Sequence, residues 1–382
     1  MGVGRNKIMK IRTKKSISLD ELAAQLNIHK EILIDCNLHE KLERGLIEEN
    51  TQLNLPFHTN IMNKKSESVH FLNDQNSMIH DHIQHDTLLK TRKPYDSQIL
   101  YKDIDKLLTM YPFIKREIIG YSVLGNPIIE LIIGRGKKTV HMNGSFHANE
   151  WITTSIMMHW LQNYLNALVT GEQFGGFDCI SFYRDTTISF VPMVNPDGVD
   201  LVVNGLPTNT NYRSFLLDIN DQSLDFSQWK ANIRGIDLNN QYPVNWEIEK
   251  ERKIPKSPAP RDYPGDAPLT EPEAIALAEL VKKRNFDRLL AFHTQGEEIY
   301  WGYLGKEPEE AESIVNEFEK MSGYRAVRNI DSHAGFRDWY VNDWRKPGFT
   351  VELGKGVNPL PFSDFDEIYR KSKGIFLAAL YK

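Results

Sequence analysis

The sequence has few cysteines and no long apolar run. Its only cysteines, Cys36 and Cys179, lie far apart in 382 residues, and we interpret both as free thiols, because a disulfide-stabilised fold needs more of them. No stretch reaches the length of about 18 apolar residues that a transmembrane helix requires, so we expect no membrane span. The N-terminal MGVGRNKIMKIRTKKS lacks the apolar core of a signal peptide, which favours a cytoplasmic protein.

The chain also lacks a strong charge bias. It carries 46 basic and 51 acidic residues, a net charge of -5. Such a balance gives no reason to expect nucleic acid or an acidic membrane as a partner. No glycine-rich phosphate loop follows a strand-like run, and no internal repeat is visible. The length predicts two domains, or one large domain with a small module.

Residues 1–57 are interpreted as the small module. Ser18 and Glu21, in SLDE, predict a capping box at the start of a helix. Leu53 and Leu55 alternate as in a strand that ends at Pro56. The order strand, helix, helix, strand resembles the lysin motif (LysM), a small α+β domain that binds the glycan strands of peptidoglycan. The chain departs from that motif at TKKSISL, where a glycine-aspartate turn is usual, and the alternative is an unrelated prodomain-like segment.

Residues 58–93 are polar and lack an apolar pattern, so we interpret them as a linker. The remaining range, 94–382, alternates between two periodicities and predicts an α/β domain with helices on both faces of a sheet. Helical stripes occupy 97–112, 151–168, 270–284 and 364–381, and strand-like apolar runs occupy 128–133, 139–143, 186–194, 288–294 and 348–353.

The stretch HMNGSFHANEW, residues 141–151, carries the first candidate metal ligands. His147 and Glu150 are three residues apart, where a predicted strand gives way to a predicted helix. Zinc accepts imidazole and carboxylate together, and a catalytic zinc keeps three protein ligands and one open position. His293 ends another apolar run, LLAFH, and is the best third ligand, whereas His141 lies inside its strand and is expected to pack in the core.

Glu352 is the candidate general base. It is a single carboxylate in the otherwise apolar strand GFTVELG, and a buried carboxylate is costly unless it is paired or functional. Three protein ligands leave a place for water, and a nearby carboxylate can accept its proton. The alternative is a glutamate satisfied by local hydrogen bonds.

Taken in order, HxxE, NPDG, DLN, His293 and the strand glutamate resemble the zinc carboxypeptidase family over residues 94–382. The resemblance implies an α/β domain with a mixed, mostly parallel sheet of eight strands. It implies one zinc ion per chain, held by His147, Glu150 and His293, with Glu352 as the general base.

The substrate-binding positions depart from that family. Family members read NRN where this chain has NNQ, so Asn239 matches but Asn240 replaces the arginine that grips a terminal carboxylate. A neutral amide cannot replace a bidentate cation. The resemblance assigns the oxyanion cation to Lys230, with Arg234 in reserve, and aligns Arg337 with the specificity position.

These departures and the LysM-like module resemble the γ-D-glutamyl-L-diamino acid endopeptidases of spore-forming bacteria. That resemblance implies cleavage between γ-D-glutamate and meso-diaminopimelate in peptidoglycan stem peptides. It also implies glycan strands as a partner and a cytoplasmic or spore-associated setting. The alternatives are a carboxypeptidase that acts on peptide C-termini and a non-catalytic cell-wall-binding protein.

Overall fold

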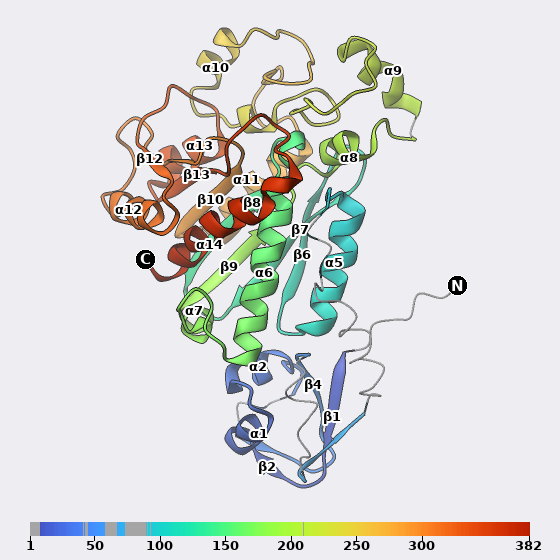
Figure 1. Ribbon diagram of the computed structural model, residues 1–382, viewed down its shortest axis with the longest axis vertical. Helices are drawn as coiled ribbons and strands as arrows, with labels where there is room; N and C mark the ends of the chain where they lie inside the picture. Colours follow the sequence, from blue (N-terminus) through green and yellow to red (C-terminus); the bar gives the residue numbers. More distant parts are fainter. Residues whose placement is uncertain are drawn as a thin grey trace. The chain divides into compact units, whose positions relative to one another are not determined.

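The structure, a computed structural model, describes residues 8–40, 42, 45–57, 67–72, 89, 91, 93–208 and 210–382 (Figure 1). These residues form two compact units. Unit 1 takes its residues from 1–90, 101–115 and 161–184, and unit 2 takes its residues from 91–100, 116–160 and 185–382. The helices α5 (Ser97–Met110) and α6 (Ile152–Thr170) therefore contribute to both units.

Unit 1 contains a small antiparallel sheet, in the order β4-β1-β5, and two short helices. Apolar side chains such as Ile11, Leu22 and Leu53 are fully buried between them. Apart from its part of α5 and α6, the elements are β1 (Met9–Thr13), β2 (Ile17–Ser18), α1 (Leu19–Leu26), α2 (Lys30–Asp35), β3 (Leu46–Ile47), β4 (Gln52–Leu55), β5 (Val69–Phe71) and α7 (Cys179–Asp185).

One of the two hydrogen bonds of the predicted capping box is present at the start of α1. The Ser18 side chain accepts a hydrogen bond from the Glu21 backbone N–H at 3.1 Å, whereas the Glu21 carboxylate accepts from Gln25 instead of reaching back. Strand β1, helices α1 and α2, and strand β4 follow one another in the predicted order. This small α+β region is compatible with the predicted module.

Two side chains of α2 bond to α7, which lies outside residues 1–57. The Tyr183 hydroxyl of α7 donates to Asp35 at 2.6 Å, and Arg184 pairs with Glu31 at 2.8 Å. The predicted linker also contributes β5, which pairs with β1. Most of residues 58–93 lie outside the described residues, so the boundaries at 57 and 94 stay predictions.

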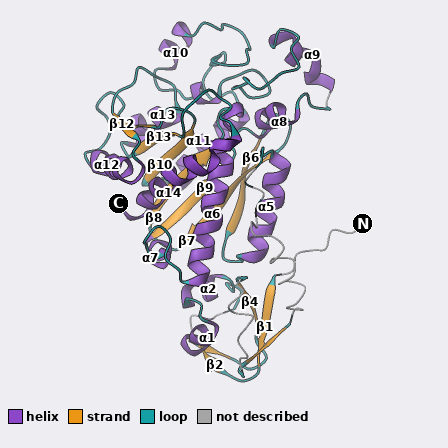
Figure 2. Ribbon diagram, in the orientation of Figure 1, coloured by secondary structure: helices purple, strands orange, loops and turns teal. Residues whose placement is uncertain are grey.

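Unit 2 is built on the predicted mixed sheet of eight strands, in the order β12-β11-β13-β10-β8-β9-β7-β6 (Figure 2). The central strands β13, β10, β8 and β9 are mutually parallel, while β7 and β11 run antiparallel to their partners β9 and β13. The strands are β6 (Lys115–Tyr121), β7 (Pro127–Gly134), β8 (Lys138–Gly144), β9 (Thr186–Val191), β10 (Arg288–His293), β11 (Glu298–Tyr300), β12 (Arg325–Val327) and β13 (Gly348–Glu352).

Helices cover both faces of this sheet. On one face, Phe376 of α14 stacks on Trp160 of α6 and on Phe292 of β10. On the other face, α11 and α13 pack on Leu289 and Ala291. The helices of unit 2 beyond its part of α5 and α6 are α8 (Pro196–Asn204), α9 (Thr210–Ile219), α10 (Trp246–Arg252), α11 (Pro272–Arg284), α12 (Glu310–Ser322), α13 (Phe336–Trp344) and α14 (Phe365–Tyr381), with the 3-10 turns η2 (Ala148–Glu150), η3 (Leu238–Asn240) and η4 (Phe362–Asp364).

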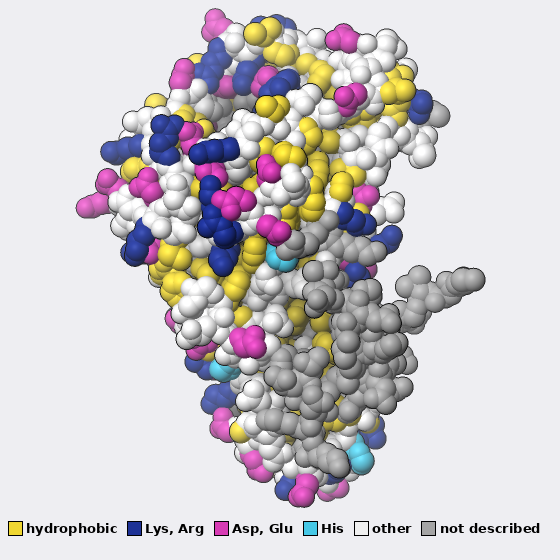
Figure 3. Space-filling model, in the orientation of Figure 1, with side chains coloured by type: hydrophobic (Ala, Val, Ile, Leu, Met, Phe, Trp, Pro, Cys, Tyr) yellow, Lys and Arg dark blue, Asp and Glu magenta, His cyan; other side chains and the backbone are white. Residues whose placement is uncertain are grey.

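The predicted fold class is confirmed, and every predicted helical stripe and strand-like run of 94–382 matches an element. His141 is fully buried and stacks on Phe286 at 4.7 Å, as expected of a core residue. Among the described helices, none is long and apolar enough to cross a membrane. Lys and Arg side chains stand among Asp and Glu side chains on the face drawn in Figure 3.

Candidate metal centre and active site

The candidate site lies at the carboxyl ends of three adjacent parallel strands of unit 2. His147 follows β8, His293 is the last residue of β10, and Glu352 is the last residue of β13. The parallel register sets His293 directly beside Glu352. In open α/β sheets this edge is where ligands bind, because the strand ends leave a crevice there.

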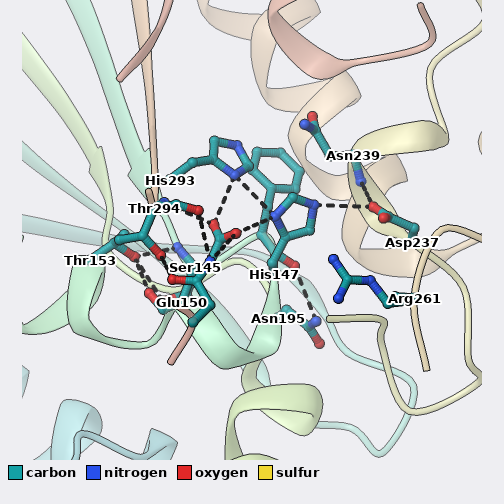
Figure 4. Close-up of polar contacts among 12 residues, drawn as sticks. Ser145, His147, Glu150, Thr153, Asn195, Asp237, Asn239, Arg261, His293 and Thr294 are labelled. Carbon is teal, nitrogen blue, oxygen red and sulfur yellow. Dashed lines mark hydrogen bonds and ion pairs between the residues drawn. The ribbon is translucent and has the colours of Figure 1, made fainter. Parts of the chain in front are cut away.

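A network of hydroxyl groups shapes the loop that carries His147 and Glu150 (Figure 4). Ser145 adopts a positive φ of 50°, which turns the chain out of the strand. Its backbone N–H donates to Thr153 Oγ1 at 2.9 Å, and the Thr153 hydroxyl donates to the Glu150 carbonyl oxygen at 2.8 Å. These bonds fix the turn η2 at the start of α6.

Asn195, from the NPDG motif, ties this loop to the segment that carries Lys230. Its Nδ2 donates to the carbonyl oxygens of Phe146 and Ala231, at 3.1 and 3.0 Å. The Ala148 N–H also donates to the Lys230 carbonyl oxygen at 3.0 Å. Asn195 therefore holds the loop with His147 and Glu150 against the segment that carries Lys230.

The three predicted metal ligands converge, and their ligand atoms all lie within 4.8 Å of one another. His147 Nδ1 is 2.9 Å from Glu150 Oε1, and His293 Nδ1 is 3.0 Å from Glu150 Oε2. The two Nδ1 atoms are 3.2 Å apart. Ligands about 2.1 Å from a tetrahedral zinc ion would be about 3.4 Å apart, so these separations suit one zinc ion.

The surroundings of the ligands also fit a metal centre. His147 Nε2, the ring nitrogen that faces away from the other two ligands, lies 3.2 Å from Asp237 Oδ1. Metal-bound histidines usually make such a bond to a carboxylate through their second ring nitrogen. The Thr294 N–H donates to Glu150 Oε2 at 3.2 Å. Two imidazoles and one carboxylate form a donor set typical of catalytic zinc.

The electrostatics favour a cation at this point. Burial alone would lower the pKa of His147, but the Glu150 and Asp237 carboxylates outweigh it and raise the pKa to about 9. Burial lowers the pKa of His293. Burial and the charge of Glu150 together raise the pKa of Glu352 to about 8. A field that holds a proton on His147 also attracts a metal cation.

The ligands open into a cavity of about 350 Å³, large enough for a small peptide segment. Its charged lining consists of the carboxylates Glu150 and Glu352 and the cations Lys230 and Arg261, beside His147. The other lining residues, most of them carrying amide or hydroxyl groups, are Asn149, Gln228, Thr294, Gln295, Tyr300, Val357 and Asn358.

Lys230 and Arg234, the two candidates for the oxyanion cation, differ in position. Lys230 lines the cavity, and although burial opposes its charged form, the Asp237 and Glu150 carboxylates raise its pKa. Arg234 is not part of the lining, and its guanidinium lies 3.6 Å from Glu271. The geometry therefore favours Lys230.

The three predicted substrate-binding residues do not line this cavity. Asn239 Oδ1 accepts the Phe336 N–H at the start of α13, and Asn240 is buried in η3. Arg337 is 3% exposed and pairs with Asp338 at 2.6 Å and with a backbone carbonyl. It is thus neither a surface residue nor a free cation, and its role in binding substrate stays a prediction.

Two residues of the site were not predicted. Asp237, in the DLN motif, supports His147. Its place two residues before Asn239 is the one feature of the sequence that could have marked it as a site residue. Arg261 reaches the cavity from the loop PAPRDYPG, where nothing in the sequence marks it as functional. Figure 4 draws its guanidinium turned toward His147.

Comparison with known proteins identifies the class. The family model for zinc carboxypeptidases matches residues 100–370, so the chain belongs to that family. It is 53% identical over 294 residues, 77% of this chain and 74% of the relative, to gamma-D-glutamyl-L-diamino acid endopeptidase 1 of Lysinibacillus sphaericus. It is 51% identical over 300 residues, 78% of this chain and 80% of the relative, to the uncharacterized protein YqgT of Bacillus subtilis (strain 168).

Solved structures agree on the fold. The crystal structure of carboxypeptidase A from Helicoverpa armigera matches with a TM-score of 0.58 at 15% identity, covering 81% of this chain and 82% of that one. Bovine thrombin-activatable fibrinolysis inhibitor matches with the same TM-score at 18% identity, and the match covers 76% of this chain and 97% of that one. The family match and the endopeptidase relative, not these structures, identify the chain as a metallopeptidase, and zinc is the metal that its donor set fits.

Replacing Asp237 with asparagine should weaken zinc binding by about 10- to 100-fold, because the amide supports the His147 ring less strongly than a carboxylate. Competition with a chromogenic chelator measures the affinity. Asp197→Asn is the matched control, since Asp197 is equally buried but accepts hydrogen bonds from Ser122 and Asn126. Equal zinc affinity in wild type and Asp237→Asn would rule out this role.

Proposed function

We propose that this chain is an endopeptidase that hydrolyses the bond between γ-D-glutamate and meso-diaminopimelate in peptidoglycan stem peptides. The observation that carries the proposal is 53% identity, across most of both chains, to a protein named gamma-D-glutamyl-L-diamino acid endopeptidase 1. The convergence of His147, Glu150 and His293 beside Glu352 supports a catalytic rather than a merely binding role.

The position of Asn240 argues against a strict carboxypeptidase. An enzyme that requires a free C-terminus needs a cation for the terminal carboxylate, and a buried amide stands where the family has arginine. Without that clamp the chain can accept a substrate that continues beyond the diamino acid. This favours cleavage inside the stem peptide.

The reaction is hydrolysis of an amide. A zinc ion held by His147, Glu150 and His293 would act as a Lewis acid and lower the pKa of the attacking water. Glu352 accepts the proton that the water loses as its oxygen bonds to the carbonyl carbon of the γ-glutamyl amide. Lys230 stabilises the negative charge that develops on the carbonyl oxygen. When the C–N bond breaks, Glu352 passes the proton to the leaving amine of the diamino acid.

A tetrapeptide separates the proposed function from its rival. On L-Ala-γ-D-Glu-meso-diaminopimelyl-D-Ala, the full chain should release the dipeptide diaminopimelyl-D-Ala, which mass spectrometry identifies. A carboxypeptidase would release D-Ala instead, and a non-catalytic cell-wall protein would release nothing. A chelator should abolish the cleavage and added zinc should restore it.

Glu352→Gln should lower turnover by about 10²- to 10⁴-fold, because an amide cannot accept the proton from water. The variant should keep one zinc ion per chain, measured by elemental analysis alongside steady-state kinetics. Glu297→Gln is the control, because Glu297 pairs with Lys355 and Lys371 and does not line the cavity. Near-normal turnover of Glu352→Gln would remove Glu352 from the role of base.

We further propose that the LysM-like module, residues 1–57, binds the glycan strands of peptidoglycan and so raises the local concentration of stem peptides. The full chain carrying Glu352→Gln, which binds without cutting, should sediment with insoluble peptidoglycan. Soluble oligomers of N-acetylglucosamine, which carry no peptide, should displace it. Sedimentation that these oligomers leave unchanged would assign the binding to stem peptides alone.

A further inference from the structure

We propose that Arg261 binds the free α-carboxylate of the γ-linked D-glutamate, and thereby makes the enzyme selective for γ-glutamyl bonds. This inference rests on the proposed function and deepens it, because it names the group on the acyl side of the bond that the chain recognises. Within the described residues, Arg261 and Lys230 are the only arginine and lysine side chains that line the cavity.

Arg261 lies beside Lys230 through backbone contacts. The carbonyl oxygen of Pro260 accepts hydrogen bonds from the backbone N–H groups of Lys230 and Ala231, at 2.9 and 3.0 Å. Both cations therefore line one part of the cavity, which His147 also lines. A substrate whose reacting carbonyl oxygen faces Lys230 presents its neighbouring groups to Arg261.

The guanidinium of Arg261 has room for a ligand. Its Nε bonds to the adjacent Asp262 at 3.1 Å, and Asp262 also lies 3.6 Å from Lys253. Within the described part of the chain, the two terminal nitrogens of Arg261 have no hydrogen-bond partner. The side chain is 52% exposed, so it is not a structural element of the core. Two parallel N–H donors match the two oxygens of a carboxylate.

The other arginines considered for substrate binding are already engaged. Arg337 is buried against Asp338, and Arg234 lies beside Glu271 outside the cavity lining. A carboxylate that enters the cavity therefore meets Arg261 as its available partner, while Lys230 faces the reacting carbonyl.

The chemistry of the substrate supplies such a carboxylate. In a γ-glutamyl bond the side-chain carboxyl group forms the amide, so the α-carboxylate stays free, four carbon–carbon bonds from the reacting carbon. An α-linked peptide carries a carboxylate at this distance only where the residue is glutamate, and its amide nitrogen then lies beside the reacting carbonyl instead of beside the free carboxylate. Recognition of this group would separate cell-wall peptides from proteins.

Two tripeptides test the inference: L-Ala-γ-D-Glu-meso-diaminopimelate and the analogue in which the glutamyl α-carboxylate is a carboxamide. Wild type should prefer the carboxylate about tenfold in kcat/KM, the low end for a charge-assisted hydrogen bond at a half-exposed site. Arg261→Ala should lose that preference and leave cleavage of the carboxamide within about twofold of wild type. Arg261→Lys should keep part of the preference.

Arg370→Ala, which removes a similarly exposed arginine bound to Glu367, is the control and should behave as wild type. If Arg261→Ala lowers kcat/KM for the two tripeptides equally, or changes neither value, Arg261 does not bind the α-carboxylate. The proposed function stands in either case. If wild type cleaves neither tripeptide before diaminopimelate, the proposed function fails and this inference fails with it.

Discussion

The buried carboxylate of Glu150, held between two imidazole rings, is the interaction on which the site depends. A carboxylate this far from water is costly unless charge and hydrogen bonds compensate it. Here His147 and His293 approach its two oxygens at 2.9 and 3.0 Å, and the Thr294 N–H adds a third bond. A zinc ion at the same point would satisfy all three ligands at once.

The fold provides this arrangement because parallel strands end at the same edge of the sheet. Residues far apart in sequence meet there: His293 lies 143 positions after Glu150 and also stands beside Glu352 of the neighbouring strand. The supporting bonds of Asn195 and Asp237 come from loops that follow other elements. The metal ligands are thus carried by rigid strands and turns, while the lining that meets substrate comes from longer loops.

This division explains which features could be predicted from sequence. The alternation of apolar runs and helical stripes follows from burial on both faces of a sheet, so the α/β class was predictable. His147 and Glu150 share a local motif, and Glu352 stands out as a charge in an apolar strand. His293 stands at the end of an apolar run, family resemblance added Lys230, and the structure brings all five residues together at one site.

The remaining features depend on contacts that no local pattern records. Arg261 reaches the cavity only because the 260–261 segment bonds to the backbone of Lys230. Arg337 is buried in α13 and pairs with Asp338, a contact that its alignment with the family does not indicate. Asp35 and Glu31 of α2 bond to α7, about 150 positions further along the chain. The contacts of Arg261 and of α2 join segments far apart in sequence, so no local pattern indicates them.

The central claim is that His147, Glu150 and His293 hold one catalytic zinc ion. Anomalous scattering at the zinc absorption edge, from crystals of the full chain grown with zinc, tests it most directly. The account predicts one strong peak about 2.0–2.2 Å from Nδ1 of both histidines and from the Glu150 carboxylate. A peak bound by other residues, or no peak at this site, would contradict it.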